Sequence, residues 1–155
     1  MSSVSFASLT NQKIDTARRF IKQSQNSEEK WLGVGLESSA IFQLRSALNG
    51  LLKEVSSAYS LSGSLDVAKL LAEAETKQMM VPVLSELSGL LSRSDSWCSQ
   101  LHQAYLVQLE CCAARSIVED DNVIGRGSDA GASVGFYLAN LVELVLRFRE
   151  ESSEY

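Results

Sequence analysis

The sequence is poor in the two residues that make tight turns. Pro82 is the only proline among 155 residues, and there are nine glycines. Antiparallel sandwiches and barrels need frequent turns, which depend on glycine and proline. Their scarcity argues against an all-β architecture and favours helices. Hydrophobic residues make up 45% of the chain and charged residues 21%, as in a folded globular domain rather than a disordered one.

Histidine and cysteine are also scarce. His102 is the only histidine, and the three cysteines are Cys98, Cys111 and Cys112. A carboxylate-bridged di-iron bundle needs two Glu-x-x-His pairs, which one histidine cannot supply. An odd number of cysteines, two of them adjacent, does not make a disulfide framework and fits a reducing compartment. We therefore expect no metal, no cofactor and a cytoplasmic location.

Clustered positive charge and long apolar runs are missing as well. The net charge is −5, and the nearest approach to a basic patch is Arg18 and Arg19 with Lys13 and Lys22. Binding to a phosphate backbone requires clustered cations, so we expect no nucleic acid as a partner. The first 25 residues carry several charges and no signal peptide, and no apolar run is long enough to span a bilayer. We expect no membrane association.

What the sequence does contain is apolar residues at helical spacing. Steps of three and four predict helices over about 5–24, 28–59 and 65–77, then a short piece ending near 92, a helix capped by Ser94 or Asp95 and ending near 117, and a last helix over 129–150. The pattern predicts one all-α domain over 1–155. Its architecture is a helical bundle of five to six helices with an up-down, four-helix-like core.

Two of these helices have informative patterns. The helix over 28–59 carries a seam of residues predicted to face the core: Val34, Ile41, Leu44, Leu48, Leu51, Val55 and Ala58. Glu37 falls in the same row, where a carboxylate would need a cation or hydrogen-bond donors. The last helix is apolar nearly all round, which predicts a central position. Its small residues Gly131, Gly135 and Ala139 predict close packing, within the chain or against a second subunit.

Several segments resemble a known family. They are Thr10 to Lys13, Ala40 to Leu44 with Ala47 and Leu48, Lys53 to Val55, Tyr59, and Asp95 to Trp97. In these segments the chain resembles an uncharacterised family of small all-helical bacterial proteins, a domain of unknown function. The resemblance covers most of the chain and rests on helix-packing residues. It implies a helical fold and no particular site.

The best candidate for chemistry is a pair on one predicted helix. Cys98 and His102 are four residues apart, so their side chains can face the same way and serve as metal ligands, or as nucleophile and base. Cys111 and Cys112 lie ~20 Å further along a straight helix, at ~1.5 Å per residue, and cannot complete a zinc site with them. Packing is the favoured interpretation of the pair.

These patterns favour a non-enzymatic protein–protein interaction module, because apolar helical surface is plentiful and polar clusters are scarce. The expected partner is another protein or a second copy of the chain. One alternative is a ligand-binding or hydrolytic bundle with a pocket near Glu37 and His102, to which Cys98, Arg45 or Arg126 would contribute. A second alternative is a weak nucleic-acid regulator acting through the basic residues of the first helix.

Overall fold

The predicted all-α fold is confirmed. The computed structural model describes residues 5–112 and 126–153, with side chains described only up to Cys112 and from Ser133. Within these ranges the secondary structure is entirely helical. The helices are α1 (Phe6–Asn26), α2 (Lys30–Tyr59), α3 (Val67–Thr76), α4 (Pro82–Leu91), α5 (Trp97–Leu109) and α7 (Arg126–Ser153).

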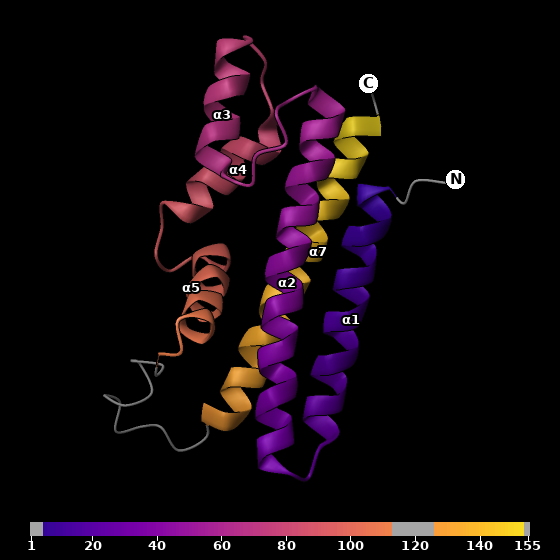
Figure 1. Cartoon of the computed structure of the whole chain (residues 1–155), viewed down its shortest axis with the longest axis vertical. Helices are drawn as coiled ribbons and strands as arrows, with labels where there is room; N and C mark the ends of the chain where they lie inside the picture. The colour runs from indigo at the N-terminus through magenta and orange to yellow at the C-terminus, as the bar shows by residue number, and fades with distance from the viewer. Residues whose placement is uncertain (1–4, 113–125, 154–155) are drawn as a thin grey trace.

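Three long helices and one shorter helix make the bundle. α1 and α2 form an antiparallel hairpin, and α7 contacts both and runs parallel to α2 (Figure 1). α5 packs against α2 and α7 on the side away from α1, and runs antiparallel to both (Figure 1). α3 and α4 pack against each other near one end of α2, where they connect α2 to α5. This is the predicted up-down, four-helix-like core with two short helices added.

α1, α3 and α5 begin where a side chain accepts a hydrogen bond from a free N–H group of the first turn, whereas α2 and α4 have no such side-chain cap. Ser5 accepts a hydrogen bond from the backbone N–H of Ser8, and Asp66 caps α3 in the same way. Ser96 caps α5, one residue after the predicted Asp95. Pro82 is the first residue of α4, the helical position where its missing N–H costs nothing. Local chemistry therefore sets these boundaries.

The C-terminal end predicted for α5 is wrong. The helix ends at Leu109 rather than near 117, because Cys111 takes a left-handed conformation with φ of 57°. The N–H of Cys112 donates to the carbonyl of Val107, and that of Cys111 to the carbonyl of Gln108. This Schellman pattern usually has glycine at the left-handed position. Here that position is Cys111, so the sequence has no glycine to indicate where the helix ends. Residues 113–117 lie outside the described part of the chain.

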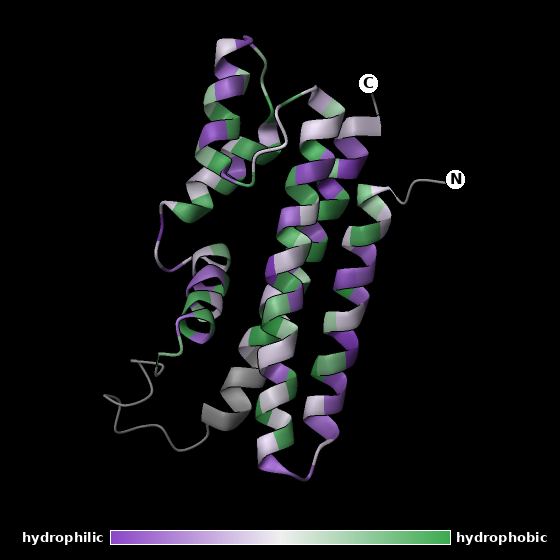
Figure 2. Cartoon of the chain, viewed as in Figure 1, coloured by the Kyte–Doolittle hydropathy of each residue, from purple (hydrophilic) through white to green (hydrophobic). Residues whose placement is uncertain are grey.

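The core runs along the middle of the bundle. α2 contributes more of it than any other described helix, and five of its seven predicted seam residues are buried: Ile41, Leu44, Leu48, Leu51 and Val55. The two ends of the seam are wrong, because Val34 and Ala58 are exposed. Figure 2 shows α2 with hydrophobic residues along much of its length, whereas α1 is mostly hydrophilic on the side turned to the viewer. The apolar repeat of α2 therefore extends further along the helix than the neighbouring helices that bury it.

α7 contacts α1, α2 and α5, as expected of a central helix. Only one of its faces is buried, however. A Cβ added at Gly135 would meet nothing within 4 Å, and Ala139 is exposed, so these two small residues do not pack closely against another helix in the part of the chain that the structure describes. The side chain position of residue 131 lies outside the described part. None of the helices in the described ranges is long and apolar enough to cross a membrane.

α1 approaches α2 closely at a glycine of α2. A Cβ added at Gly50 would lie 2.4 Å from Oγ1 of Thr10, well inside van der Waals contact. Thr10 is buried, and its hydroxyl donates to the carbonyl of Phe6 at 2.8 Å. The hydroxyl of Thr10 therefore has its hydrogen bond within α1, and the Thr10 side chain fills the space where Gly50 has no Cβ.

Candidate functional site

Glu37 lies at the α1–α2 interface. Ser24 of α1 donates its hydroxyl both to the carbonyl of Gly33 at 3.0 Å and to Oε1 of Glu37 at 3.3 Å. Partial burial raises the pKa of Glu37, and the hydrogen bond from Ser24 opposes this effect. Among the described residues the carboxylate therefore has a hydrogen-bond donor but no ion-pair partner, and this hydrogen bond joins α1 to α2.

His102 faces a different part of α2. Its Nδ1 accepts a hydrogen bond from Nε of Arg45 at 3.2 Å. A ring nitrogen that accepts carries no proton, so the imidazole is neutral with its proton on Nε2. Burial lowers the pKa of His102, and the positive charge of Arg45 lowers it further. The histidine is thus held uncharged.

Two aromatic rings and an amide complete this contact between α2 and α5. Nη1 of Arg45 donates to Oδ1 of Asn49 at 2.6 Å, and the guanidinium lies 5.8 Å from the ring centroid of Tyr105. Tyr105 packs edge-on against Phe42 with centroids 5.3 Å apart. We call Phe42, Arg45, Asn49, His102 and Tyr105 the arginine–histidine cluster. It fastens α5 to α2 through polar and aromatic contacts.

Cys98 is buried one turn before His102. Burial raises the pKa of its thiol to about 11, and the charge of Arg45 only partly offsets this. A thiol with so high a pKa carries almost no thiolate near neutral pH, and the Nδ1 of His102 is already occupied by Arg45. Cys98 and His102 therefore lack the arrangement of a nucleophile and its base. Cys111 and Cys112 are exposed beyond the end of α5.

The structure does not bring Glu37 and His102 together. Glu37 contacts α1, whereas the partner of His102 is Arg45, eight residues further along α2 and therefore ~12 Å away along the helix axis. In the described ranges, no group of three or more histidine, cysteine, aspartate or glutamate side chains is placed to hold a metal ion. The side chain of Arg126 lies outside the described part.

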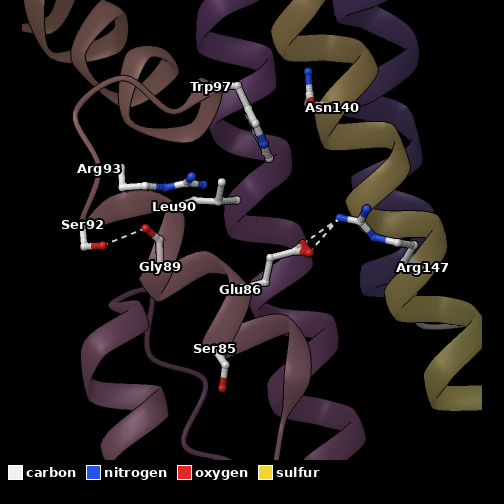
Figure 3. A pocket seen from close by; sticks show the side chains of 9 residues that line it. All are labelled: Ser85, Glu86, Gly89, Leu90, Ser92, Arg93, Trp97, Asn140 and Arg147. Carbon is white, nitrogen blue, oxygen red and sulfur yellow. Dashed lines mark hydrogen bonds and ion pairs between the residues drawn. The ribbon is translucent and has the colours of Figure 1, made fainter.

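An open groove lies between α4 and α7, on the side of α4 that faces away from α3 (Figure 3). We call it the α4–α7 groove, and its volume is about 570 Å³. Its lining comprises Ser85, Glu86, Gly89, Leu90, Ser92, Arg93, Trp97, Asn140 and Arg147. Sequence reasoning missed it because the lining comes from α4, the turn after it, the start of α5 and the distant α7.

The charges in this groove are unevenly partnered. Arg147 donates from Nη2 to both carboxylate oxygens of Glu86, at 2.7 and 3.0 Å, and this ion pair bridges α7 and α4. Arg93, on the opposite wall, has no ion pair or side-chain hydrogen bond to any residue in the described ranges. The groove therefore has one paired and one unpaired guanidinium.

A second ion pair on α7 is buried. Arg149 holds both carboxylate oxygens of Glu54, from Nε at 3.0 Å and from Nη2 at 3.3 Å. Its other donors reach Oδ1 of Asn11 at 2.8 Å and the carbonyl of Ala7 at 3.2 Å. The glutamate side chain is only 8% exposed. One arginine thus joins α1, α2 and α7.

Comparison with known proteins places the chain in a family. The model of a family of unknown function (DUF6586) matches residues 1–155. The chain belongs to this family. No curated protein and no solved structure matches it.

The predicted resemblance to an uncharacterised helical family is thereby confirmed. Several residues that carried the resemblance meet in this DUF6586 protein at one end of the bundle. Asn11 and Glu54 both contact Arg149, and the hydroxyl of Tyr59 lies 3.2 Å from Oε1 of Glu151. These contacts join the long helices, so in this DUF6586 chain the residues stabilise the fold.

Proposed function

We propose that this protein is a non-enzymatic, cytoplasmic interaction module that self-associates through one face of α2. The observation that carries the proposal is the difference in length between α2, with 30 residues, and the α5 helix that covers it, with 13. Phe42 and Arg45 mark the face of α2 that contacts α5. The same face continues toward the start of α2, past the end of α5.

The uncovered part of this face is apolar. Going back from Phe42 in helical steps leads to Ser38, Val34 and Trp31, because residues three and four apart share a face. Trp31 is 72% exposed and Val34 56% exposed. The indole N–H of Trp31 donates to Glu29 at 2.6 Å, which holds the ring in one orientation. We call Trp31 and Val34 the open face of α2.

A second copy of the chain suits this surface. Large apolar side chains with a fixed tryptophan are the usual energetic centre of protein interfaces. The residues beside the open face are Glu28, Glu29 and Lys30, which carry both signs of charge. Two copies related by a two-fold axis can place the lysine of each opposite a glutamate of the other, since such an interface pairs a surface with itself.

The test is the mass of the protein in solution over a range of concentrations, measured by light scattering coupled to size exclusion. We expect a dimer that dissociates on dilution, and a monomer for the double variant Trp31→Ser, Val34→Ser. The matched control is Phe136→Ser, Leu146→Ser, which removes two residues of α7 that are 56% and 55% exposed. It should remain dimeric.

Two outcomes overturn the proposal. A monomer at every concentration excludes self-association. A dimer that survives Trp31→Ser, Val34→Ser places the interface elsewhere.

A further inference from the structure

The α4–α7 groove has hydrogen-bond donors that no protein atom uses. The side chain of Trp97 is 9% exposed, and its indole nitrogen makes no hydrogen bond within the described ranges. That nitrogen keeps some exposure to solvent, and Trp97 is one of the residues that line the groove. Figure 3 shows the indole extending between α4 and α7, with the guanidinium of Arg93 on the α4 side.

The one carboxylate of the groove, in contrast, already has a cation as partner. Both carboxylate oxygens of Glu86 accept from Nη2 of Arg147. The Ser92 hydroxyl donates to the carbonyl of Gly89 at 2.7 Å, and the Asn140 amide donates to its own helix at 2.9 Å. Ser85, Ser92 and Asn140 offer neutral oxygen atoms as further acceptors, so among the described residues of the groove the one charge without a partner is that of Arg93, and the indole N–H of Trp97 is a second unused donor. A ligand that complements them supplies a charged acceptor.

The shape of the groove indicates what kind of molecule carries that acceptor. Small-molecule sites enclose most of their ligand, whereas this groove is open to solvent along its length. A Cβ added at Gly89 would meet nothing within 4 Å, so the wall is low there and a peptide backbone can pass close to α4. Leu90 provides apolar surface beside the polar groups.

A nucleic acid is a poorer match for these charges. The two arginines and one glutamate of the groove leave a net charge of +1, and only one guanidinium is unpaired. Binding to a phosphate backbone relies on several cations in a row to release counterions. One carboxylate against one guanidinium is the simplest match.

We propose that the α4–α7 groove binds an acidic peptide segment of a partner protein. A glutamate or aspartate side chain of the segment accepts hydrogen bonds from Arg93 and from the indole nitrogen of Trp97, and an adjacent apolar side chain lies against Leu90. The ion pair with Glu86 holds Arg147 at the mouth of the groove. This assigns a second binding surface, separate from the open face of α2.

The experiment uses Trp97 as its own reporter. Trp31→Phe leaves Trp97 as the sole tryptophan, and its fluorescence is followed while capped peptides are added. The probes are short Leu-Glu-Leu peptides and matched Leu-Gln-Leu peptides, blocked at both ends so that their termini carry no charge. We expect a saturable change with the glutamate peptide and at least about tenfold weaker binding of the glutamine peptide, because a charge-assisted hydrogen bond is lost.

Two variants locate the site. Arg93→Gln should weaken the glutamate peptide about tenfold, and Gly89→Leu should abolish its binding by filling the groove. Arg18→Gln, which removes an exposed arginine of α1, is the control and should leave binding unchanged. Circular dichroism establishes that each variant is folded.

The proposal is overturned if both peptides bind equally, or if Arg93→Gln leaves a folded protein with unchanged affinity. It is overturned equally if acetate or inorganic phosphate produces the same saturation at the same concentration, because the groove then recognises a free anion rather than a peptide. Arg93→Gln, Gly89→Leu and Arg18→Gln leave the open face of α2 unchanged and do not affect the self-association test. Only the Trp31→Phe background changes a residue of that face. Failure of one proposal is therefore distinguishable from failure of the other.

Discussion

The two ends of the long helices are built in opposite ways. At the end where α7 finishes, Gly50 lets α1 approach α2, and Arg149 binds Glu54 at the meeting point of α1, α2 and α7. At the end where α2 begins, Trp31 and Val34 are exposed. We call these the closed end and the open end. The difference teaches that one end of the bundle joins three helices through a buried ion pair, whereas the other leaves apolar side chains of α2 uncovered.

The largest expected effect comes from removing the buried cation of the closed end. Arg149→Ala leaves the carboxylate of Glu54 buried without a partner, and we expect the free energy of unfolding to fall by about 3 kcal/mol. This is the low end of the usual range, since Arg149 is 28% exposed. Urea unfolding followed by circular dichroism measures it.

The control is an arginine two residues earlier on the same helix. Arg147→Ala breaks the exposed pair with Glu86, in which the side chains are 58% and 40% exposed, and should cost about 0.5 kcal/mol. Equal losses for the two variants would mean that the closed end has no special share of the stability.

The next effect tests close packing at the same end. Gly50→Ala places a Cβ against Thr10 and should lower the free energy of unfolding by about 1 kcal/mol, because overpacking outweighs the better helix propensity of alanine. On the same helix, a Cβ at Gly35 meets nothing within 4 Å, so Gly35→Ala should stabilise by about 0.5 kcal/mol. Thermal melting distinguishes the two signs.

A second substitution tests the cause of the Gly50→Ala effect. Adding Thr10→Ala removes the oxygen that the new Cβ would meet and should recover part of the loss. If Gly50→Ala and Gly35→Ala have the same sign, the two helices do not touch as closely at Thr10 as the structure shows.

A smaller effect depends on pH and on the junction between α2 and α5. His102 is neutral in the folded protein, and its pKa lies below the ordinary value of 6.5. Below pH 6.5 the unfolded chain therefore binds more protons than the folded one, so stability falls as the pH drops toward the pKa of the folded state. Protonation also ends the hydrogen bond from Arg45. The free energy of unfolding, measured from pH 7 to pH 5, should fall as the pH drops, and the fall should be smaller in His102→Gln.

NMR titration of His102 provides an independent check. A pKa above 6.5 in the folded protein would contradict the hydrogen bond in which Nδ1 accepts from Arg45.

The smallest expected effect lies toward the open end. Partial burial disfavours the charged form of Glu37, so Glu37→Gln should leave stability at neutral pH unchanged or slightly higher, with Ser24 donating to the amide oxygen instead. Self-association should be unaffected as well. A marked loss of stability, measured by urea unfolding, would show that the carboxylate has a role beyond joining α1 and α2.

The sequence was most informative where an element depends on nearby residues. Pro82 marks the start of α4 because its ring suits the first helical position. The seam from Ile41 to Val55 is buried as predicted, since its period is that of the helix. The end of α5 could not be predicted, because Cys111 adopts the conformation that sequence reasoning assigns to glycine.

The candidate sites were less predictable, because each depends on residues distant in sequence. Glu37 and His102 were placed in one pocket on the strength of a helical row and a solitary histidine. The structure shows that each has its own partner, Ser24 and Arg45 respectively. Arg93 gains its significance only from Trp97 and the distant α7, which form the groove with it.

By itself, the sequence determined the class of fold, most helix positions and the buried row of α2, because helix formation and amphipathic burial depend on residues within a few turns of each other. Only the tertiary structure decided that Arg149 meets Glu54 and Asn11, that α5 stops short of the first turns of α2, and that Arg93 lies across a groove from Arg147. These pairings depend on how whole helices lie against one another. A periodic pattern specifies which face of a helix is buried, but not which helix covers it or where that cover ends.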